Sequence, residues 1–136
     1  MSMLASDKHY KVANSTVAML KYHLVWSTRR RRDVLKGAVA DRLETLLHDT
    51  AEELGIDIIR LRIEPDFVHM YVVATPNLAP TQIVYRLKNG SAALRDEFED
   101  LKRIPSMWTS ACLVSSAPNL RPDEIQLYIQ AQSKSA

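Results

Sequence analysis

The chain has 136 residues, 46% of them hydrophobic and 25% charged, with a formal net charge of +2. These values exclude a largely disordered chain and predict a single domain over 1–136, with a flexible arm at about 1–15. One cysteine, Cys112, excludes an internal disulfide framework, and its apolar surroundings favour a buried small hydrophobe. We expect no membrane contact and a cytoplasmic location, because no apolar run reaches a span of roughly 20 residues and no signal peptide begins the chain.

Hydrophobic periodicity predicts seven segments of regular structure. In chain order they are a strand at 17–26, a helix at 34–54, strands at 56–63 and 67–74, a helix at 80–98, a strand at 108–114 and a helix at 122–132. A short link through Pro65 predicts a hairpin between the second and third strands. Gly90 weakens the second helix by about 1 kcal/mol relative to Ala and indicates a bend or a close approach. This order predicts an α+β protein with a ferredoxin-like split β-α-β-β-α-β antiparallel sheet and an added C-terminal helix.

The strand at 67–74 contains a single side chain that could bind a metal. Alternation places Phe67, His69 and Tyr71 on one face, and Asp66 and Met70 on the other. A lone histidine on a strand is more often packed or hydrogen-bonded than a ligand, since a metal centre usually has three or more ligands. His69 therefore has two interpretations, a packed histidine and a metal ligand.

The last predicted helix presents a phenol and an amide one turn apart. Glu124, Tyr128 and Gln132 share one stripe, beside an apolar stripe of Ile125 and Ile129. An ordinary amphipathic helix with a half-buried tyrosine explains this pattern. The alternative is a tyrosine nucleophile that attacks phosphorus. A phenol with a pKa of about 10 would then need a cation or a base to assist it.

Basic side chains form two candidate phosphate-binding patches. They are Arg29, Arg30, Arg31 and Arg32 after the first strand, and Arg86 and Lys88 in the second helix. Such a run is usually a solvated loop, but four adjacent guanidinium groups favour phosphate contacts. Tyr22, Trp26 and Trp108 could stack on unpaired bases, although packing in the core is the default for each.

Taken in order, these motifs resemble the small single-tyrosine insertion-sequence transposases of the HUH superfamily, the TnpA type. The resemblance covers about 22–132. It rests on Tyr22-His23-Leu24-Val25-Trp26 with the basic run, Pro65-Asp66-Phe67-Val68-His69, Leu87-Lys88-Asn89-Gly90-Ser91, Trp108, and Ile125-Gln126-Leu127-Tyr128-Ile129 with Gln132.

The resemblance implies a homodimer that binds hairpins at transposon ends in single-stranded DNA, in a prokaryotic cytoplasm and at the nucleoid during activity. A tyrosine attacks the scissile phosphate, forms a 5′-phosphotyrosine bond and releases a 3′-hydroxyl, and strand exchange reseals the DNA. Mg²⁺ or Mn²⁺ is held by the two histidines of a His-hydrophobic-His motif, often with a glutamine, in sites shared between subunits. By this resemblance Tyr128 matches the nucleophile, His69 the second histidine and Gln132 the helix ligand.

Phe67 departs from this family pattern, because it occupies the position of the first histidine. A phenyl ring cannot bind a hard divalent ion, so we expect the metal to be weakly bound or absent. Asp66 points to the other face unless a bulge redirects it, and Glu124 is a further candidate for the site. Water and DNA phosphate oxygens could also complete the shell, as they commonly do for Mg²⁺.

Three hypotheses follow. The leading one is a transposase-family protein that binds hairpin-bearing single-stranded DNA, with cleavage by Tyr128 weakened or lost. The second keeps the enzyme active, a metal-dependent tyrosine DNA transposase in which His69, Gln132, water and DNA complete the metal shell. The third is a catalytically inactive module of the same fold that binds RNA, single-stranded DNA or a protein through aromatic side chains such as Phe67 and Tyr71. It ranks last because it leaves the pair formed by Tyr128 and Gln132 unexplained.

Overall fold

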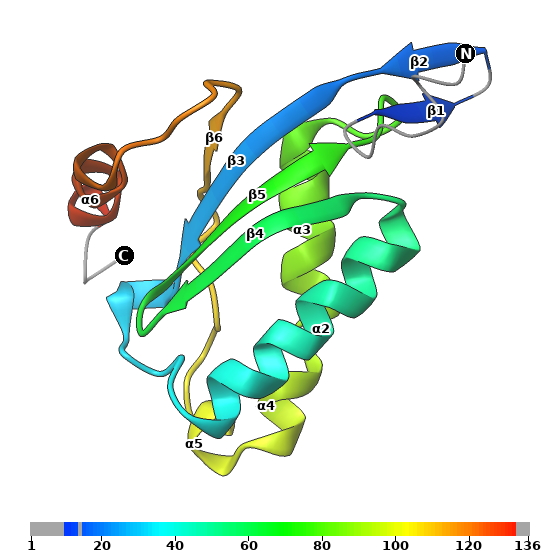
Figure 1. Ribbon diagram of the computed structural model, residues 1–136. Helices are drawn as coiled ribbons and strands as arrows, with labels where there is room; N and C mark the ends of the chain where they lie inside the picture. The colour runs from blue at the N-terminus through cyan, green and yellow to red at the C-terminus, as the bar shows by residue number, and fades with distance from the viewer. Residues whose placement is uncertain (1–9, 14, 133–136) are drawn as a thin grey trace.

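A four-stranded antiparallel sheet forms the centre of the computed structural model, which describes residues 10–13 and 15–132 (Figure 1). Its strands are β3 (Leu20–Ser27), β4 (Asp57–Glu64), β5 (Phe67–Ala74) and β6 (Leu113–Ser115), in the order β4-β5-β3-β6. The order and the antiparallel pairing match the split ferredoxin-like arrangement, so the predicted fold class is confirmed.

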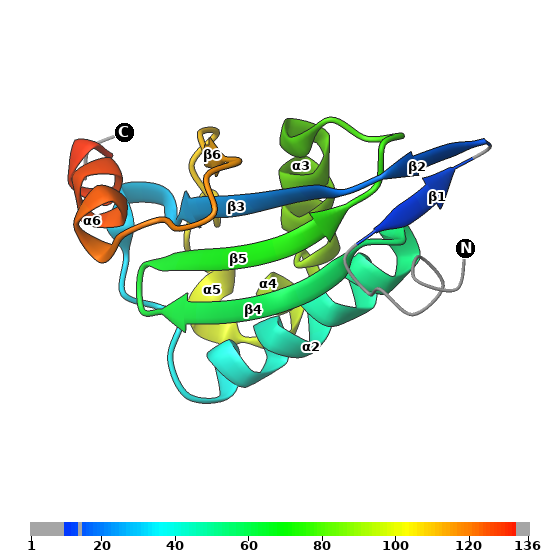
Figure 2. The same ribbon diagram turned by 45° about the horizontal axis from the view of Figure 1, so that its top comes forward.

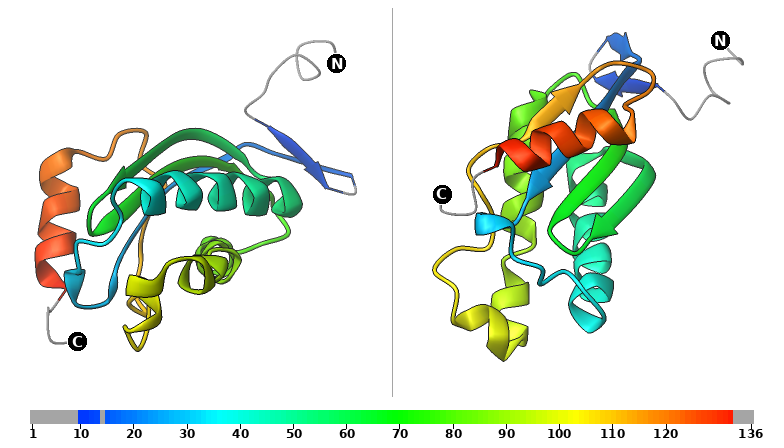
Figure 3. Two further views of the ribbon diagram at one scale, coloured as in Figure 1. Left: turned by 90° about the horizontal axis from the view of Figure 1, so that it is seen from below. Right: turned by 90° about the vertical axis from the view of Figure 1, so that its left-hand side faces the viewer.

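Helices cover the sheet unequally. The helices are α2 (Ala38–Leu54), α3 (Pro80–Gly90), α4 (Ala93–Glu97), α5 (Glu99–Lys102) and α6 (Pro122–Ala131). Figure 3 shows α2 to α5 on one side of the sheet and α6 across one end of the other side. Within the described part of the chain, no helix has the length and apolar character that a bilayer crossing needs.

Pairing between β3 and β5 separates the two faces. His23 lies opposite Tyr71, and Val25 lies opposite His69. These four side chains point away from α2 and α3. The alternate residues point toward those helices and form the main core. They include Leu24, Trp26, Val68, Met70 and Val72, each with a relative exposure of 0%. The predicted alternation in the strand at 67–74 is therefore confirmed.

The start of the chain differs from the prediction. Residues 1–9 of the expected arm lie outside the described residues, but β1 (Lys11–Ala13) pairs with β2 (Thr16–Ala18) as a hairpin. The predicted strand at 17–26 is therefore interrupted at Met19, where the chain passes from this hairpin into β3 (Figure 2). The arm prediction was wrong for 11–13, because a local partner strand satisfies backbone groups that the sequence pattern treated as free.

Two helices and one strand are shorter than predicted. The helix expected at 34–54 begins at Ala38, after Gly37 adopts a φ of 58°. The helix expected at 80–98 ends at Gly90, and α4 and α5 follow it. Of the strand expected at 108–114, Trp108 makes only an isolated bridge with Thr28, and β6 covers Leu113–Ser115. The carbonyls of Thr109 and Ala111 accept hydrogen bonds from Lys88 Nζ at 2.8 and 3.0 Å, which replaces strand pairing.

Gly90 marks a close approach between α3 and α2. A Cβ atom at position 90 would lie 2.0 Å from Oγ1 of Thr50 and 3.1 Å from its Cβ. Thr50 is buried at 6% exposure, so it has little room to move. The sequence-based interpretation of Gly90 as a close approach is therefore confirmed.

We expect Gly90→Ala to lower the free energy of unfolding by about 1–3 kcal/mol, the usual cost of overpacking. Urea denaturation measures this change. Thr50→Ala in the same chain removes Oγ1 and should recover part of the loss, so the two changes are non-additive. A stabilised Gly90→Ala protein, as helix propensity alone would give, would contradict the close contact.

Candidate functional site

Two histidines lie side by side on the sheet face opposite the main core. His23 Nδ1 is 2.9 Å from His69 Nε2, and the ring of His23 stacks on Tyr71 with centroids 4.2 Å apart. His23 Nε2 lies 3.5 Å from the carbonyl oxygen of Pro118. Because a carbonyl can only accept, that contact places the proton of His23 on Nε2 and leaves a lone pair on Nδ1.

A cavity of about 330 Å³ opens beside this pair, between the sheet and the loop before α6. Its lining includes both histidines, Arg60, Arg62 and Asn119. Arg62 Nε also binds Glu64 Oε1 at 2.6 Å, and the Arg60 guanidinium lies 5.9 Å from the centre of the Tyr71 ring. Two guanidinium groups beside two imidazoles make this cavity suited to a phosphate group.

Both imidazoles are held in the neutral form at pH 7. Burial is the main cause that lowers the pKa of His69 to about 4, and nearby His23, Arg62 and Arg60 contribute to this value in that order. Burial is also the main cause that lowers the pKa of His23, opposed by its contact with Pro118. Neutral imidazoles keep a ring nitrogen with a free lone pair, which is the form that binds metal ions.

Helix α6 packs on the same sheet face through an apolar cluster. Ile125 and Ile129 contact Val25 and Phe67, and all four side chains have relative exposures of 3% or less. Phe67, predicted as the altered motif position, is therefore an apolar contact for the helix that contains Tyr128.

Tyr128 is half-buried against this cluster, and its hydroxyl has no hydrogen-bond partner among the described residues. Burial, and secondarily Cys112, raises the pKa of Tyr128 to about 12. Gln132 follows the last turn of α6, where its backbone N–H donates to Ile129 at 3.0 Å. The cavity beside the histidines is lined by Pro122 and Ile125 of α6 but not by Tyr128 or Gln132.

The two carboxylates considered as replacement ligands have other partners. Asp66 Oδ2 lies 3.4 Å from Arg31 Nε, and Glu124 Oε1 accepts the backbone N–H of Arg121 at 3.0 Å. Over the described residues, no three His, Cys, Asp or Glu side chains gather closely enough to hold a metal ion. The remaining nitrogen ligands at this site are thus the two imidazoles.

The predicted basic residues fall into different environments. Arg29 and Arg30 are exposed in the 3₁₀ turn η1 (Arg29–Arg31), whereas Arg31 and Arg32 are partly buried. Arg86 is exposed on α3.

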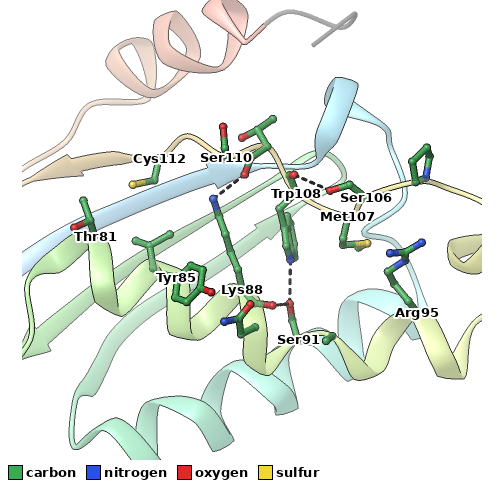
Figure 4. Close-up of a pocket in the computed structure, with 15 residues that line it drawn as sticks. Thr81, Tyr85, Lys88, Ser91, Arg95, Ser106, Met107, Trp108, Ser110 and Cys112 are labelled. Atoms are coloured by element: carbon green, nitrogen blue, oxygen red, sulfur yellow. Dashed lines mark hydrogen bonds between the residues drawn. The ribbon is translucent and has the colours of Figure 1, made fainter.

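Lys88, by contrast, points its ammonium at the carbonyls of the segment before β6, and burial lowers its pKa (Figure 4). In the same region, Trp108 Nε1 donates to Ser91 Oγ at 3.0 Å. Arg29, Arg30 and Arg86 remain accessible to a phosphate backbone.

Sequence reasoning did not assign four polar residues of the cavity to the site: His23, Arg60, Arg62 and Asn119. Alternation did place His23 on the face of Val25, but the pairing of that strand with β5 is a long-range contact. A hairpin register carried back from Pro65 would have placed Arg62 opposite His69, as the structure has it.

The family model described as "Transposase IS200 like" matches residues 16–132, so the chain belongs to the IS200-like family of insertion-sequence transposases. It is 35% identical over 127 residues to the ISDra2 transposase TnpA of Deinococcus radiodurans, with 90% of each chain covered.

Two solved structures are similar to the chain. One, from Deinococcus radiodurans R1 and described as a transposase, has a TM-score of 0.82 at 33% identity and covers 90% of this chain and 98% of its own. The other, a REP-associated tyrosine transposase bound to a REP hairpin, has a TM-score of 0.57 at 10% identity and covers 90% of this chain and 67% of its own. At that identity, the second similarity concerns the fold alone.

The buried histidine predicts how stability depends on pH in metal-free protein. The pKa of His69 is about 4 in the folded protein, below the ordinary histidine pKa of 6.5, so the unfolded chain binds more protons between these values. The free energy of unfolding should therefore fall as the pH is lowered from about 6.5 toward 4. Urea denaturation in EDTA across this range should show a flatter dependence for His69→Gln.

His48→Gln is the matched control, since His48 is exposed on α2 away from the pair. It should keep the steep dependence of the unmodified protein. Equal slopes for the unmodified protein and His69→Gln would contradict the buried, neutral state of His69.

Proposed function

We propose that this chain binds hairpin-bearing single-stranded DNA at the ends of an insertion sequence and cleaves and rejoins it through Tyr128. The observation that carries the proposal is the position of α6, which packs Tyr128 on the sheet face that also holds His23, His69, Arg60 and Arg62. Membership of the IS200-like family supports the same function.

In the proposed step, the hydroxyl oxygen of Tyr128 attacks the scissile phosphorus while the bond from phosphorus to the 3′ oxygen breaks. The phenolic proton leaves to water, and the departing 3′ oxygen gains a proton to become a hydroxyl. The product is a 5′-phosphotyrosine. Attack by the 3′-hydroxyl of another strand reverses the chemistry, joins the DNA and restores the tyrosine.

Arg60 and Arg62 are the proposed phosphate-binding groups of the cavity. Guanidinium groups donate paired hydrogen bonds to phosphate oxygens and stabilise charge that develops on them. Neutral His69 and His23 add ring nitrogens without further positive charge. Arg29, Arg30 and Arg86 would contact the DNA backbone at a greater distance from the cut.

A divalent ion, Mg²⁺ or Mn²⁺, would polarise the scissile phosphate. His69 has a nitrogen suited to it, but Gln132 does not line the same cavity and Phe67 offers no donor atom. The set of ligands that the family resemblance implies is therefore incomplete in this arrangement. We infer that cleavage is weaker than it would be with a histidine at position 67.

Tyr128 must leave its buried position to react. A buried hydroxyl without a hydrogen-bond partner costs roughly 1–3 kcal/mol, and a pKa near 12 makes the phenol a poor nucleophile in this position. Repositioning of α6 would remove both penalties. We propose that it occurs in a homodimer in which the helix of one subunit serves the cavity of the other.

A binding role without cleavage is the second candidate function, and the burial of Phe67 favours it. In that case the cavity holds DNA or RNA phosphate and α6 stays docked. Both candidate functions use Arg60 and Arg62 to bind phosphate, so only the reaction of Tyr128 distinguishes them.

We expect the unmodified protein to form a covalent adduct with labelled hairpin-bearing single-stranded DNA in Mn²⁺, at a level at least about tenfold below that of Phe67→His. A denaturing gel measures the adduct. Tyr128→Phe should abolish it in both backgrounds. Since Phe67 is buried, circular dichroism and thermal melting must first show that Phe67→His is folded.

An adduct that survives Tyr128→Phe would exclude this residue as the nucleophile. No adduct in the unmodified protein, but a clear one in Phe67→His, would establish the binding role. Equal binding of hairpin-bearing single strands and random duplex would rule out the DNA preference in both candidates.

We expect Arg60→Gln and Arg62→Gln each to weaken binding of single-stranded DNA and to reduce the slope of log K against log salt by about 0.7, the value for one phosphate contact. Fluorescence anisotropy over a salt series measures both quantities. Arg103→Gln is the charge-matched control, because Arg103 is exposed at the end of α5 and does not line the cavity. An equal effect of Arg103→Gln would indicate a nonspecific charge effect.

A further inference from the structure

We propose that His23 and His69 together bind a divalent transition-metal ion such as Mn²⁺ or Co²⁺, with His23 supplying the imidazole that position 67 lacks. The inference deepens the proposed function, on which it rests for its use in DNA cleavage. The binding itself needs only the two side chains and the cavity beside them, so it can be tested without DNA.

The spacing of the two ring nitrogens fits one ion. Ligand nitrogens about 2.1 Å from a metal and at a right angle to each other lie about 3.0 Å apart. His23 Nδ1 and His69 Nε2 are 2.9 Å apart. The pair is thus already at the separation of adjacent ligands in an octahedral shell.

The proton arrangement of His23 also fits a ligand. Its Nε2–H faces the carbonyl of Pro118 at 3.5 Å, so the Nδ1 lone pair points to His69. A ligating histidine usually donates its other ring N–H to such a carbonyl, which fixes the ring orientation. Binding replaces the hydrogen bond between the two rings. His69 moves its proton from Nε2 to Nδ1, and both rings turn so that their lone pairs meet at the ion. No net proton is gained or lost.

His23 is also held rigidly, which lowers the entropy cost of binding. Its exposure is 4%, and its ring stacks on Tyr71 at an interplanar angle of 13°. Tyr71 lies opposite His23 in the β3–β5 register. The sheet therefore holds this imidazole next to His69 before any ion arrives.

The cavity leaves space for the other ligands. Its volume of about 330 Å³ is large compared with the roughly 30 Å³ of a water molecule. Water, phosphate oxygens and the amide oxygen of Asn119, which lines the cavity, are the available donors. Imidazole nitrogens favour transition metals over Mg²⁺, so the ion preference should move toward Mn²⁺ and Co²⁺.

Arg60 and Arg62 oppose a cation at this place. Both guanidinium groups line the same cavity as His69, so their positive charges lie close to the proposed ion. Arg62 is partly compensated by Glu64 at 2.6 Å. We therefore expect binding without DNA to be weak but specific.

The first test uses full-length, tag-free protein with ¹⁵N-labelled histidine, after EDTA treatment and without DNA. Zn²⁺, a diamagnetic ion that takes the same nitrogen ligands, is added up to one equivalent, and the imidazole nitrogens are followed by NMR. We expect the signals of His23 Nδ1 and His69 Nε2 to shift together, with His48 unchanged as the internal control. A shift of His69 without His23, or equal shifts of all four histidines, would overturn the proposal.

The second test measures Co²⁺ affinity by calorimetry for the unmodified protein, His23→Asn and His48→Asn. His23→Asn should weaken binding at least tenfold, whereas His48→Asn and a hundredfold excess of Mg²⁺ should change it little. No binding by the unmodified protein, or unchanged affinity in folded His23→Asn, would overturn the proposal. If His23→Asn does not fold, the NMR result on the unmodified protein decides.

These tests are independent of the proposed cleavage. Metal binding at both histidines without any Tyr128 adduct would support this site and count against the proposed enzyme. A Tyr128 adduct without metal binding at His23 would support the proposed enzyme and count against this metal site.

Discussion

The pairing of β3 with β5 is the constraint on which both faces of the molecule depend. It places His23 opposite Tyr71, Val25 opposite His69 and Ser27 opposite Phe67. A slip of one residue would move the apolar set that packs on α2 and α3 to the other face, so the core fixes this register strongly. The cavity is therefore positioned by packing on the opposite side of the sheet, and its own polar groups need not define the fold.

Phe67 affects both metal binding at the site and the position of Tyr128. Burial of a phenylalanine side chain contributes about 1.5–3 kcal/mol to stability. Phe67 is buried by its contacts with Val25, Ile125 and Ile129, so this contribution stabilises the docked position of α6. The unpartnered hydroxyl of Tyr128 costs roughly 1–3 kcal/mol in the same docked helix. These opposing contributions are similar in size. A histidine at position 67 would weaken the first without changing the second, which favours release of α6 as well as metal binding.

Local sequence patterns predicted most of the fold. The strand at 67–74 has the predicted bounds, because alternation and the turn at Pro65 are both short-range signals. The approach of His23 to His69 could not be read in this way, since the two residues are 46 positions apart and meet only through strand pairing. The segment after Trp108 has a strand-like composition, yet its carbonyls at Thr109 and Ala111 accept hydrogen bonds from Lys88 instead of from a neighbouring strand. Tertiary contacts determine both the histidine pair and the structure after Trp108.

The charge of the cavity determines how DNA and a metal ion would affect each other. Arg60 and Arg62 disfavour a cation at the imidazoles when no anion is present, because their charges reach His69. A bound phosphate would compensate both guanidinium groups and add oxygen ligands, so the ion would bind more tightly to the DNA complex than to the free protein. Linkage requires the ion to tighten DNA binding by the same factor. A weak two-histidine site is therefore compatible with a metal that acts only when the DNA is in place.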